Sequence, residues 1–260
     1  MTTLTGDRMK VDYDDIAATY DTRYDRNRYG EVRDTVMRFV GDATNVVEVG
    51  CGTGHWLAEL GGGDRRVVGI DPSWGMLQHA ERHAEHASLI RGVADALPIR
   101  SRATDRVFCI NAFHHFPDKT AFVAEARRVL RDGGALMIVG LDPHTGIDQW
   151  WVYDYFPSTL PIDLVRYAST PAIRQMLADA GFSSIQTNVA QHFPAAIPFD
   201  KALERGYLDR RSTSQLMAIP DDEYRVGMER LSAERPLIRA DLRVYATIGL
   251  VEKGVGQIGA

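Results

Sequence analysis

The feature that most constrains this chain is a short apolar segment that runs directly into three closely spaced glycines. Residues 46–49 are Val-Val-Glu-Val, and Gly50, Gly52 and Gly54 follow. Glycine permits positive φ angles and lets a ligand approach the backbone, and a helix that begins after such a turn presents N–H groups to an incoming ligand. The segment therefore predicts a strand, a glycine turn and a helix over about residues 55–60, which together bind a nucleotide-like ligand.

Strand-like and helix-like segments alternate from this turn to about residue 141. Short β-branched or apolar runs predict the strands, and apolar residues spaced three and four apart predict the helices between them. Ser73 is expected to cap one helix, and Asp132-Gly133-Gly134 is expected to form a turn. The predicted strands are 46–49, 66–70, 88–91, 106–111 and 135–139. This alternation predicts an α/β fold, in which helices cover both faces of a parallel sheet.

The two ends of the chain depart from this rhythm. Residues 13–40 predict two helices interrupted near Gly30. One face of the first helix is predicted to carry Tyr13, Ile16, Ala17, Tyr20 and Tyr24. Toward the C-terminus the predicted elements are a helix from Thr170 to near Gly181, a strand over 182–191, helices over 199–234 with a break near Pro220, and a strand over 242–251.

The composition is that of an ordinary globular protein, and its charge does not indicate a strongly charged partner. Of the 260 residues 45% are hydrophobic, and the formal net charge is -5. This balance gives no general attraction to nucleic acid or anionic lipid, so neither is expected as a partner. Two cysteines, Cys51 and Cys109, do not indicate a disulfide scaffold. No apolar run reaches the roughly 20 residues that span a bilayer, and no apolar signal segment is found, so we expect a cytoplasmic protein.

An acidic residue at the end of the second predicted strand narrows the choice of ligand. Asp71 follows the glycines by roughly 20 residues, where a carboxylate accepts hydrogen bonds from ribose hydroxyls. To this point a nicotinamide dinucleotide fits nearly as well. However, the loop has the spacing Gly-x-Gly-x-Gly with His55 next, instead of the Gly-x-Gly-x-x-Gly of dinucleotide-binding loops. Asp95, which follows the third strand, is placed to accept a hydrogen bond from an adenine amino group.

Five segments occur in one order along roughly residues 13–141. They are residues 46–54, Gly69-Ile70-Asp71, Ala94-Asp95-Ala96-Leu97-Pro98, Asn111-Ala112-Phe113-His114-His115-Phe116 and Leu130-Arg131-Asp132-Gly133-Gly134. Together they resemble the class I S-adenosylmethionine (SAM)-dependent methyltransferases, particularly the small-molecule branch similar to ubiquinone and menaquinone biosynthesis enzymes. The resemblance implies a Rossmann-like, seven-stranded, mostly parallel sheet. Its last strand would run antiparallel between the fifth and sixth, and a helical and aromatic cap would cover the site.

The chain is expected to form one methyltransferase domain over residues 1–260. Its parts are an N-terminal helical lid (1–40), a cofactor-binding core (41–141), and cap helices with the final strands (142–260). The resemblance implies SAM as cofactor and S-adenosylhomocysteine as product. Either Trp74 or Met76 would pack against the adenine, and Glu48 stands where the family's first motif often has aspartate. The expected cofactor-binding residues are Tyr20, Glu48, Gly50, Gly52, Gly54, Asp71, Pro72, Met76, Asp95, Ala96, Asn111 and Phe113.

Histidines supply candidate bases near the expected position of the reacting methyl group. His114 and His115 follow the fourth strand, and either is a candidate general base for an acceptor that must lose a proton. The alternatives are that one of them braces the next turn through Asp118, or that the reaction proceeds by proximity alone. His144, after the fifth strand, is a second candidate. Three further histidines, His79, His83 and His86, share one helix face with interleaved charges, which favours a solvated face and no metal site.

Aromatic residues crowd the segment after the fifth strand. In the expected fold this region and the N-terminal helix cover the acceptor, although such residues also commonly attach a cap to its domain. The predicted acceptor pocket consists of Tyr24, His144, Trp150, Trp151 and Tyr155. The predicted function is transfer of a methyl group from SAM to an O, N, S or C atom of a small-molecule metabolite.

Missing motifs narrow this prediction further. The segment from Asn111 to His114 is not the Asn/Asp-Pro-Pro-aromatic motif of DNA amine methyltransferases. No paired-glutamate loop of protein arginine methyltransferases, no thiol set for arsenite and no carboxylate set of catechol enzymes is found. Two alternatives stay open: a non-methylating protein of the same fold that binds SAM, and, less favoured, an NAD-dependent oxidoreductase.

Overall fold

The computed structural model describes residues 17–21, 24, 29–61 and 64–253. Two short helices precede the sheet, α1 (Ala17–Tyr20) and α3 (Gly30–Val40). The predicted interruption near Gly30 coincides with the start of α3. Tyr13 and Ile16, which were predicted to share a helix face with Tyr20, lie outside the described residues.

A single sheet forms the centre of the molecule, with the strand order β3-β2-β1-β4-β5-β8-β6 and with β7 also paired to β8. The strands are β1 (Asn45–Val49), β2 (Arg66–Asp71), β3 (Ser88–Arg91), β4 (Thr104–Ile110), β5 (Leu130–Leu141), β6 (Gln149–Trp150), β7 (Ser183–Pro198) and β8 (Leu237–Leu250). Strand β8 runs antiparallel to β5, β6 and β7, and the pairs among β1 to β5 are parallel. The predicted α/β fold with an inserted antiparallel strand is confirmed; the two-residue β6 was not predicted.

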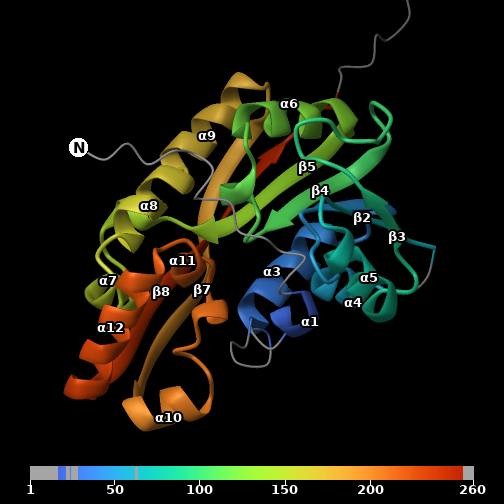
Figure 1. Ribbon diagram of the computed structural model, residues 1–260. Coiled ribbons are helices and arrows are strands. Elements are labelled where there is room, and N and C mark those ends of the chain that lie inside the picture. Colours follow the sequence, from blue (N-terminus) through green and yellow to red (C-terminus); the bar gives the residue numbers. More distant parts are fainter. Residues whose placement is uncertain (1–16, 22–23, 25–28, 62–63, 254–260) are drawn as a thin grey trace, which may run out of the picture.

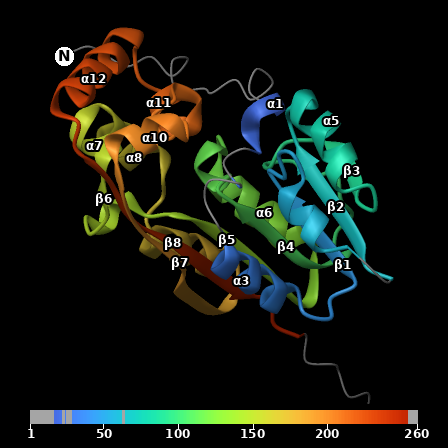
Figure 2. The same cartoon turned by 90° about the horizontal axis from the view of Figure 1, so that it is seen from below.

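Helices cover both faces of this sheet, as Figures 1 and 2 show. Helices α3 and α4 (His55–Glu59) bury Val36, Trp56 and Leu57 in a core that includes Val46 of β1. On the opposite face α6 (Lys119–Val129) and α9 (Thr170–Asp179) pack together over Val47 and Val107. The alternate residues Val46 and Val47 of β1 thus point into two separate cores, which is why valines occupy both positions.

Side-chain caps fix where three of the helices begin. The hydroxyl of Ser73 accepts a hydrogen bond from the backbone N–H of Met76 at 3.0 Å and starts α5 (Trp74–His83), as predicted. Asp118 caps α6 and Ser169 caps α9 in the same way. Such caps satisfy N–H groups that the first turn of a helix leaves without a partner.

The predicted turn at Asp132-Gly133-Gly134 is instead a bulge within β5. Leu130 already pairs with Thr104, and the next paired residue, Ala135, lies opposite Arg106. Residues 131–134 therefore have only Asp105 opposite them, and Gly133 takes a φ of +77°. The two glycines of this segment are typical of a turn. The pairing of Leu130 with Thr104, which is distant in the sequence, instead makes residues 131–134 part of the strand.

Strands β7 and β8 are longer than predicted and extend past the core. The sixth strand was predicted over residues 182–191, whereas β7 continues through Pro194 to Pro198. Strand β7 pairs only with β8, and proline is tolerated on such an edge strand. The extension carries a cap of α7 (Trp151–Tyr155), α8 (Thr159–Arg166), α10 (Phe199–Glu204), α11 (Ser214–Met217) and α12 (Asp221–Glu234), which lies to one side of the sheet in Figure 1. No helix in the described ranges is long and apolar enough to cross a membrane.

Candidate cofactor and acceptor site

The glycine turn is fastened to the carboxyl end of β2. The backbone N–H of Gly50 donates to the carbonyl of Ile70 at 2.7 Å, and that of Gly52 donates to Oδ2 of Asp71 at 2.9 Å. Gly50, Gly52 and Gly54 have φ angles of +74°, +53° and +80°. These left-handed conformations are the ones that glycine adopts without steric cost, which explains the spacing in the sequence.

The three glycines differ in how closely other residues approach them, and this difference shows which of them close packing requires. A Cβ on Gly50 would lie 2.5 Å from Cβ of Ala112, and one on Gly54 would lie 3.0 Å from Cβ of Ala80. Among the described residues, a Cβ on Gly52 would meet only the ring of Tyr20, at 3.9 Å. Gly50 and Gly54 are therefore required by close packing, whereas Gly52 leaves an open cradle beneath Tyr20.

Asp71 stands at the end of β2 with both carboxylate oxygens oriented. Oδ2 accepts from Gly52, and Oδ1 accepts from the backbone N–H of Ser73 at 2.9 Å. A carboxylate oxygen has a second lone pair, so this geometry leaves capacity for hydroxyl donors of a ribose. The backbone N–H of Gly92 donates to the carbonyl of Asp71 at 3.2 Å, which brings the turn that carries exposed Asp95 and Ala96 beside it.

Glu48 is the most unusual carboxylate of this region. It is 1% exposed, and neither carboxylate oxygen has a hydrogen-bond partner among the described residues. Burial raises its pKa well above the ordinary value, and the nearby charge of Asp71 raises it further. A buried polar group without a partner is costly for the empty fold, so Glu48 marks a place where a polar ligand group can complete the bonding.

The two residues predicted as alternatives for packing against the adenine, Met76 and Trp74, differ in how far they are buried. Met76 is fully buried and packs against Ala17 of α1, with Tyr20 and Met217 beside them. Trp74 is 52% exposed at the start of α5. The side chain of Met76 therefore supports the N-terminal helix, and of the two predicted alternatives only Trp74 offers an open aromatic face next to Pro72.

Helix α1 is held on the glycine turn by Asp21. The hydroxyl of Thr53 donates to Asp21, whose other carboxylate oxygen lies 3.2 Å from Nδ1 of His83. His83 and His86 also contact the backbone carbonyls of Thr53 and Leu57 at 3.2 and 3.0 Å. These histidines thus tie α5 to its neighbours. The part of the chain that the structure describes has no group of three or more His, Cys, Asp or Glu side chains suited to a metal ion.

Strand β4 ends in a strained residue. Asn111 has a φ of +52°, and its backbone N–H donates to the carbonyl of Val139 at 2.8 Å. A non-glycine residue with positive φ is uncommon and is often found at functional sites. Asn111 lines the large cavity described next, whereas Phe113 is buried and packs against Phe116 and Phe122.

A cavity of about 390 Å³ begins at Asn111 and runs beneath the cap. Its walls come from the ends of β4 and β5, from β7 and β8, and from the cap helices. Trp150 and Trp151 line it, as predicted for the acceptor pocket. Tyr29, which packs edge-on against Phe193 at 5.2 Å between ring centroids, adds a wall from the N-terminal segment.

Three residues predicted for this pocket do not line it. Tyr24 stacks on His55, with 3.6 Å between ring centroids. His144 contacts the backbone carbonyl of Tyr167 through Nε2 at 2.9 Å. The hydroxyl of Tyr155 donates to Glu234 at 2.6 Å on the outer side of the cap. The sequence placed these residues near the pocket but did not determine the directions of their side chains.

Neither His114 nor His115 lines the large cavity. They lie in the short 3-10 helix Phe113–His115, where the ring of His114 stacks on that of Tyr167 at 4.1 Å and 13°. Nε2 of His114 is 3.2 Å from the hydroxyl of Tyr167, and the ring of His115 lies 3.8 Å from that of His114. Tyr167 lines the large cavity and also a cavity of about 20 Å³ that His114 borders. Tyr167 therefore separates these histidines from the larger space.

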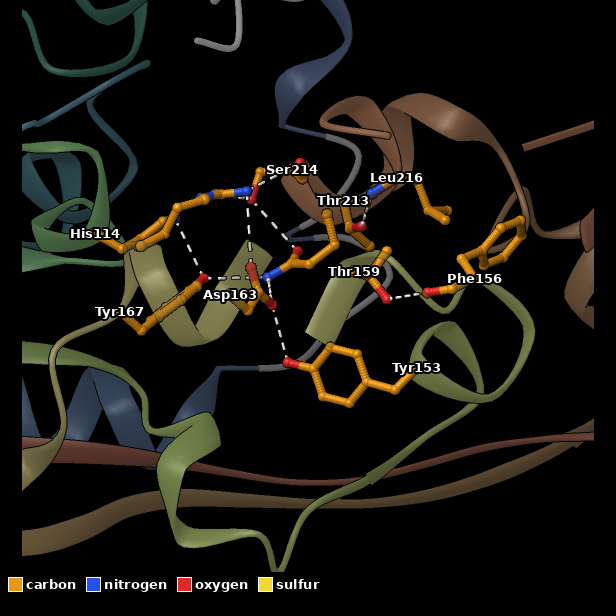
Figure 3. A network of polar contacts seen from close by, with 11 residues as sticks. His114, Tyr153, Phe156, Thr159, Asp163, Tyr167, Thr213, Ser214 and Leu216 are labelled. Carbon is orange, nitrogen blue, oxygen red and sulfur yellow. Dashed lines mark hydrogen bonds and ion pairs between the residues drawn. The ribbon is translucent and has the colours of Figure 1, made fainter. Parts of the chain in front are cut away.

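A buried polar network continues from Tyr167 into the cap (Figure 3). Nε2 of Gln215 donates to the hydroxyl of Tyr167 at 3.2 Å and to Oδ2 of Asp163 at 2.9 Å, and the hydroxyl of Tyr153 donates to the same oxygen at 2.9 Å. Arg166 lies 3.7 Å from the other carboxylate oxygen. Burial raises the pKa of Asp163, whereas Arg166, Gln215 and Tyr153 act to lower it.

Sequence reasoning missed the roles of Asp163 and Gln215. Both lie on short cap helices, and their local sequence carries no motif. Only the packing of α8 against α11 brings them together. The sequence offered one indication of these roles, namely that each polar residue stands next to apolar residues of its helix.

The fold and the candidate site point to one class of protein. The molecule is an open α/β domain with one antiparallel strand beside β5, and its glycine turn and Asp71 lie at the carboxyl edge of the sheet, where such domains bind nucleotides. Residues 47–138 match the family model described as a methyltransferase domain. This match and the relatives named below support a class I SAM-dependent methyltransferase, with SAM as the cofactor.

The relatives carry names that state different reactions and different substrates. A malonyl-[acyl-carrier protein] O-methyltransferase of Hahella chejuensis is 34% identical over 143 residues, which cover 52% of this chain and 50% of that protein. A demethylmenaquinone methyltransferase of Renibacterium salmoninarum is 29% identical over 67% of this chain and 76% of its own length. A tRNA U34 carboxymethyltransferase of Alteromonas mediterranea is 28% identical, over 68% of this chain and 55% of that protein. The chain thus spans about half the length of the Hahella and Alteromonas relatives.

A solved structure shows the same fold. Phosphoethanolamine N-methyltransferase 2 of Haemonchus contortus, in complex with SAM, matches with a TM-score of 0.61 at 16% identity, covering 94% of this chain and 61% of that chain. The residues described above fit such a cofactor. Gly52 offers an open cradle, Asp71 holds the backbone of the glycine turn at the end of β2, and Glu48 is a buried carboxylate without a described partner.

Proposed function

We propose that this protein transfers a methyl group from SAM to an uncharged, largely apolar small molecule held in the large cavity. The observation that carries the proposal is the position of that cavity. It starts at Asn111, at the carboxyl end of β4, and its walls are mostly aromatic and aliphatic. Pockets of this size and lining are typical of sites for small organic molecules.

The charges of the lining argue for a neutral acceptor. No Lys, Arg, Asp or Glu is among the described residues that line the cavity. His192 at its rim faces Asp241, with Nε2 2.6 Å from the carboxylate. Burying a carboxylate or phosphate here without a cationic partner would cost several kcal/mol, roughly the penalty for an unpaired buried ion. This feature favours a small neutral molecule over a nucleic acid or an acidic thioester.

The three parts of the chain take separate roles in this proposal. Helix α1 covers the cofactor, the described residues of the core between 41 and 141 bind it, and residues 142–253 shape most of the acceptor cavity. SAM supplies an electrophilic methyl group on a positively charged sulfur. The glycine turn, Asp71 and Glu48 hold SAM, Asn111 lies where the two ligands meet, and the cap excludes water so that an in-line approach is maintained.

The histidine base predicted from the sequence is not part of this proposal. Tyr167 stands between His114 and the large cavity, and the two rings are nearly parallel. Nε2 of His114 also forms a hydrogen bond with the hydroxyl of Tyr167, at 3.2 Å. His114 therefore supports Tyr167, and acceptors that need no strong base are favoured.

The proposal is tested by transfer of labelled methyl from SAM to a panel of neutral aromatic alcohols and amines, with charged analogues alongside. Phe193→Ala removes a half-buried wall of the cavity, and we expect KM for the acceptor to rise at least tenfold while SAM affinity is unchanged. Tyr155→Phe, outside the cavity, is the matched control and should behave as wild type. SAM binding without transfer to any member of the panel, or equal KM in the two variants, would refute the acceptor assignment.

A further inference from the structure

Three polar residues of the cavity lining belong to one buried network in the cap. Gln215, Ser214 and Tyr167 line the cavity together with apolar side chains such as Leu242 and Val244. Gln215 is only 5% exposed. A polar side chain so buried is expected to have its hydrogen-bonding groups assigned, and the network identifies their directions.

The amide of Gln215 has a fixed orientation. Its nitrogen donates to Oδ2 of Asp163 at 2.9 Å and to the hydroxyl of Tyr167 at 3.2 Å. The hydroxyl of Tyr153 also donates to Oδ2, so that oxygen is an acceptor whether or not Asp163 carries a proton on its other oxygen. An amide carbonyl could not replace the nitrogen at that position, because two acceptors would then face each other.

The amide oxygen is the group that this arrangement leaves for a ligand. The hydroxyl of Ser214 is 3.4 Å from it, which is long for a hydrogen bond, and the same hydroxyl accepts from Arg166 at 2.9 Å. An amide oxygen has two lone pairs, so it can accept at least one further bond. The contact of the amide nitrogen with Asp163 also polarises the amide and strengthens its oxygen as an acceptor.

We propose that Gln215 is a specificity-determining residue of the cavity and that it selects acceptors carrying a neutral hydrogen-bond donor, a hydroxyl or an N–H group. This inference rests on the proposed function, because it assigns the acceptor to the large cavity. Asp163, which also binds Tyr153 and Arg166, acts on the acceptor through the orientation that it gives Gln215. An ether or another group without a donor leaves the oxygen of Gln215 with only its long contact to Ser214 and binds less well.

The test compares two probes that differ only in the donor, 2-naphthol and 2-methoxynaphthalene. Their Kd values are measured by calorimetry on the full chain saturated with S-adenosylhomocysteine, so that no transfer occurs. The ratio of the two Kd values is compared between wild type and Gln215→Met, which keeps the length of the side chain and removes its amide. We expect the preference for 2-naphthol to fall about three- to tenfold in the variant, as for the loss of one neutral hydrogen bond. An unchanged ratio overturns the proposal.

Two controls separate the possible failures. Gln215→Asn, which withdraws the oxygen by one methylene, replaces Gln215→Met if the latter does not fold, and it should reduce the same ratio. Phe193→Ala should weaken both probes equally if they occupy the cavity. Binding that is weakened in Phe193→Ala, with a ratio unaffected by Gln215, overturns the role of Gln215 and leaves the proposed function intact. If the wild-type protein binds neither probe, the result contradicts both the role of Gln215 and the proposed function.

Discussion

Replacing Glu48 with glutamine is expected to change how the stability of the empty protein depends on pH. Glu48 is buried, its carboxylate oxygens have no hydrogen-bond partner among the described residues, and its pKa in the folded protein is raised well above 4.5. Burial is the larger cause, and the charge of Asp71 adds to it. The unfolded chain therefore releases this proton at a lower pH than the folded protein does.

The magnitude follows from this difference. A carboxyl whose folded pKa is raised contributes its full stability below the unfolded pKa and loses it as pH rises through the folded pKa. Between the two values the free energy of unfolding of wild type falls by about 1.4 kcal/mol per pH unit relative to a side chain that does not titrate. Glutamine has the same shape as a protonated glutamate but does not titrate. The free energy of unfolding of Glu48→Gln should therefore rise relative to that of wild type by about 1.4 kcal/mol for each pH unit in this range.

Urea unfolding of both proteins without SAM at about pH 5.5 and pH 6.5 measures the effect. Other titrating groups are common to the two proteins and cancel in the difference. The expected gap in the free energy of unfolding widens by about 1.4 kcal/mol over this interval while Glu48 stays protonated in the folded protein. A gap that is constant with pH would show that Glu48 finds a partner that stabilises its charge, and the reasoning from burial would be wrong.

Further predictions concern the glycine turn and the base of the sheet. Gly52→Ala should weaken SAM binding at least tenfold in a calorimetric titration, because the methyl enters the open cradle and the left-handed backbone costs about 1–2 kcal/mol; exposed Gly30→Ala, with nothing within 4 Å of its new Cβ, should bind normally. Asp105 accepts bonds from Asn45 and Thr44 and pairs with Arg131, and these interactions outweigh burial and lower its pKa. Asp105→Asn should therefore lose about 2 kcal/mol in thermal unfolding at neutral pH. This loss should shrink as pH falls through the folded pKa, and a loss equal at all pH values would contradict it.

The sequence was most informative where structure is local or where one residue type is required. The strand Asn45–Val49, the capping of α5 by Ser73 and the glycine turn were all predicted, because periodicity, a cap and positive φ leave a direct signal. The full length of β7 was not predicted. A strand can contain these prolines because it lies at the edge of the sheet, and the sequence does not show that position. Asp163 and Gln215 meet only through the packing of two cap helices, which no local pattern reports.

Strand β8 gives the molecule a modular construction. Residues 199–236, which include α10, α11 and α12, form a single excursion between two strands that pair with each other along their lengths. The sheet, the glycine turn and the residues proposed to hold SAM lie outside this excursion. A lineage can therefore exchange the excursion, and with it Gln215 and Ser214, while every strand pairing of the core is kept. Acceptor choice and cofactor binding are thus free to change at different rates in proteins built on this plan.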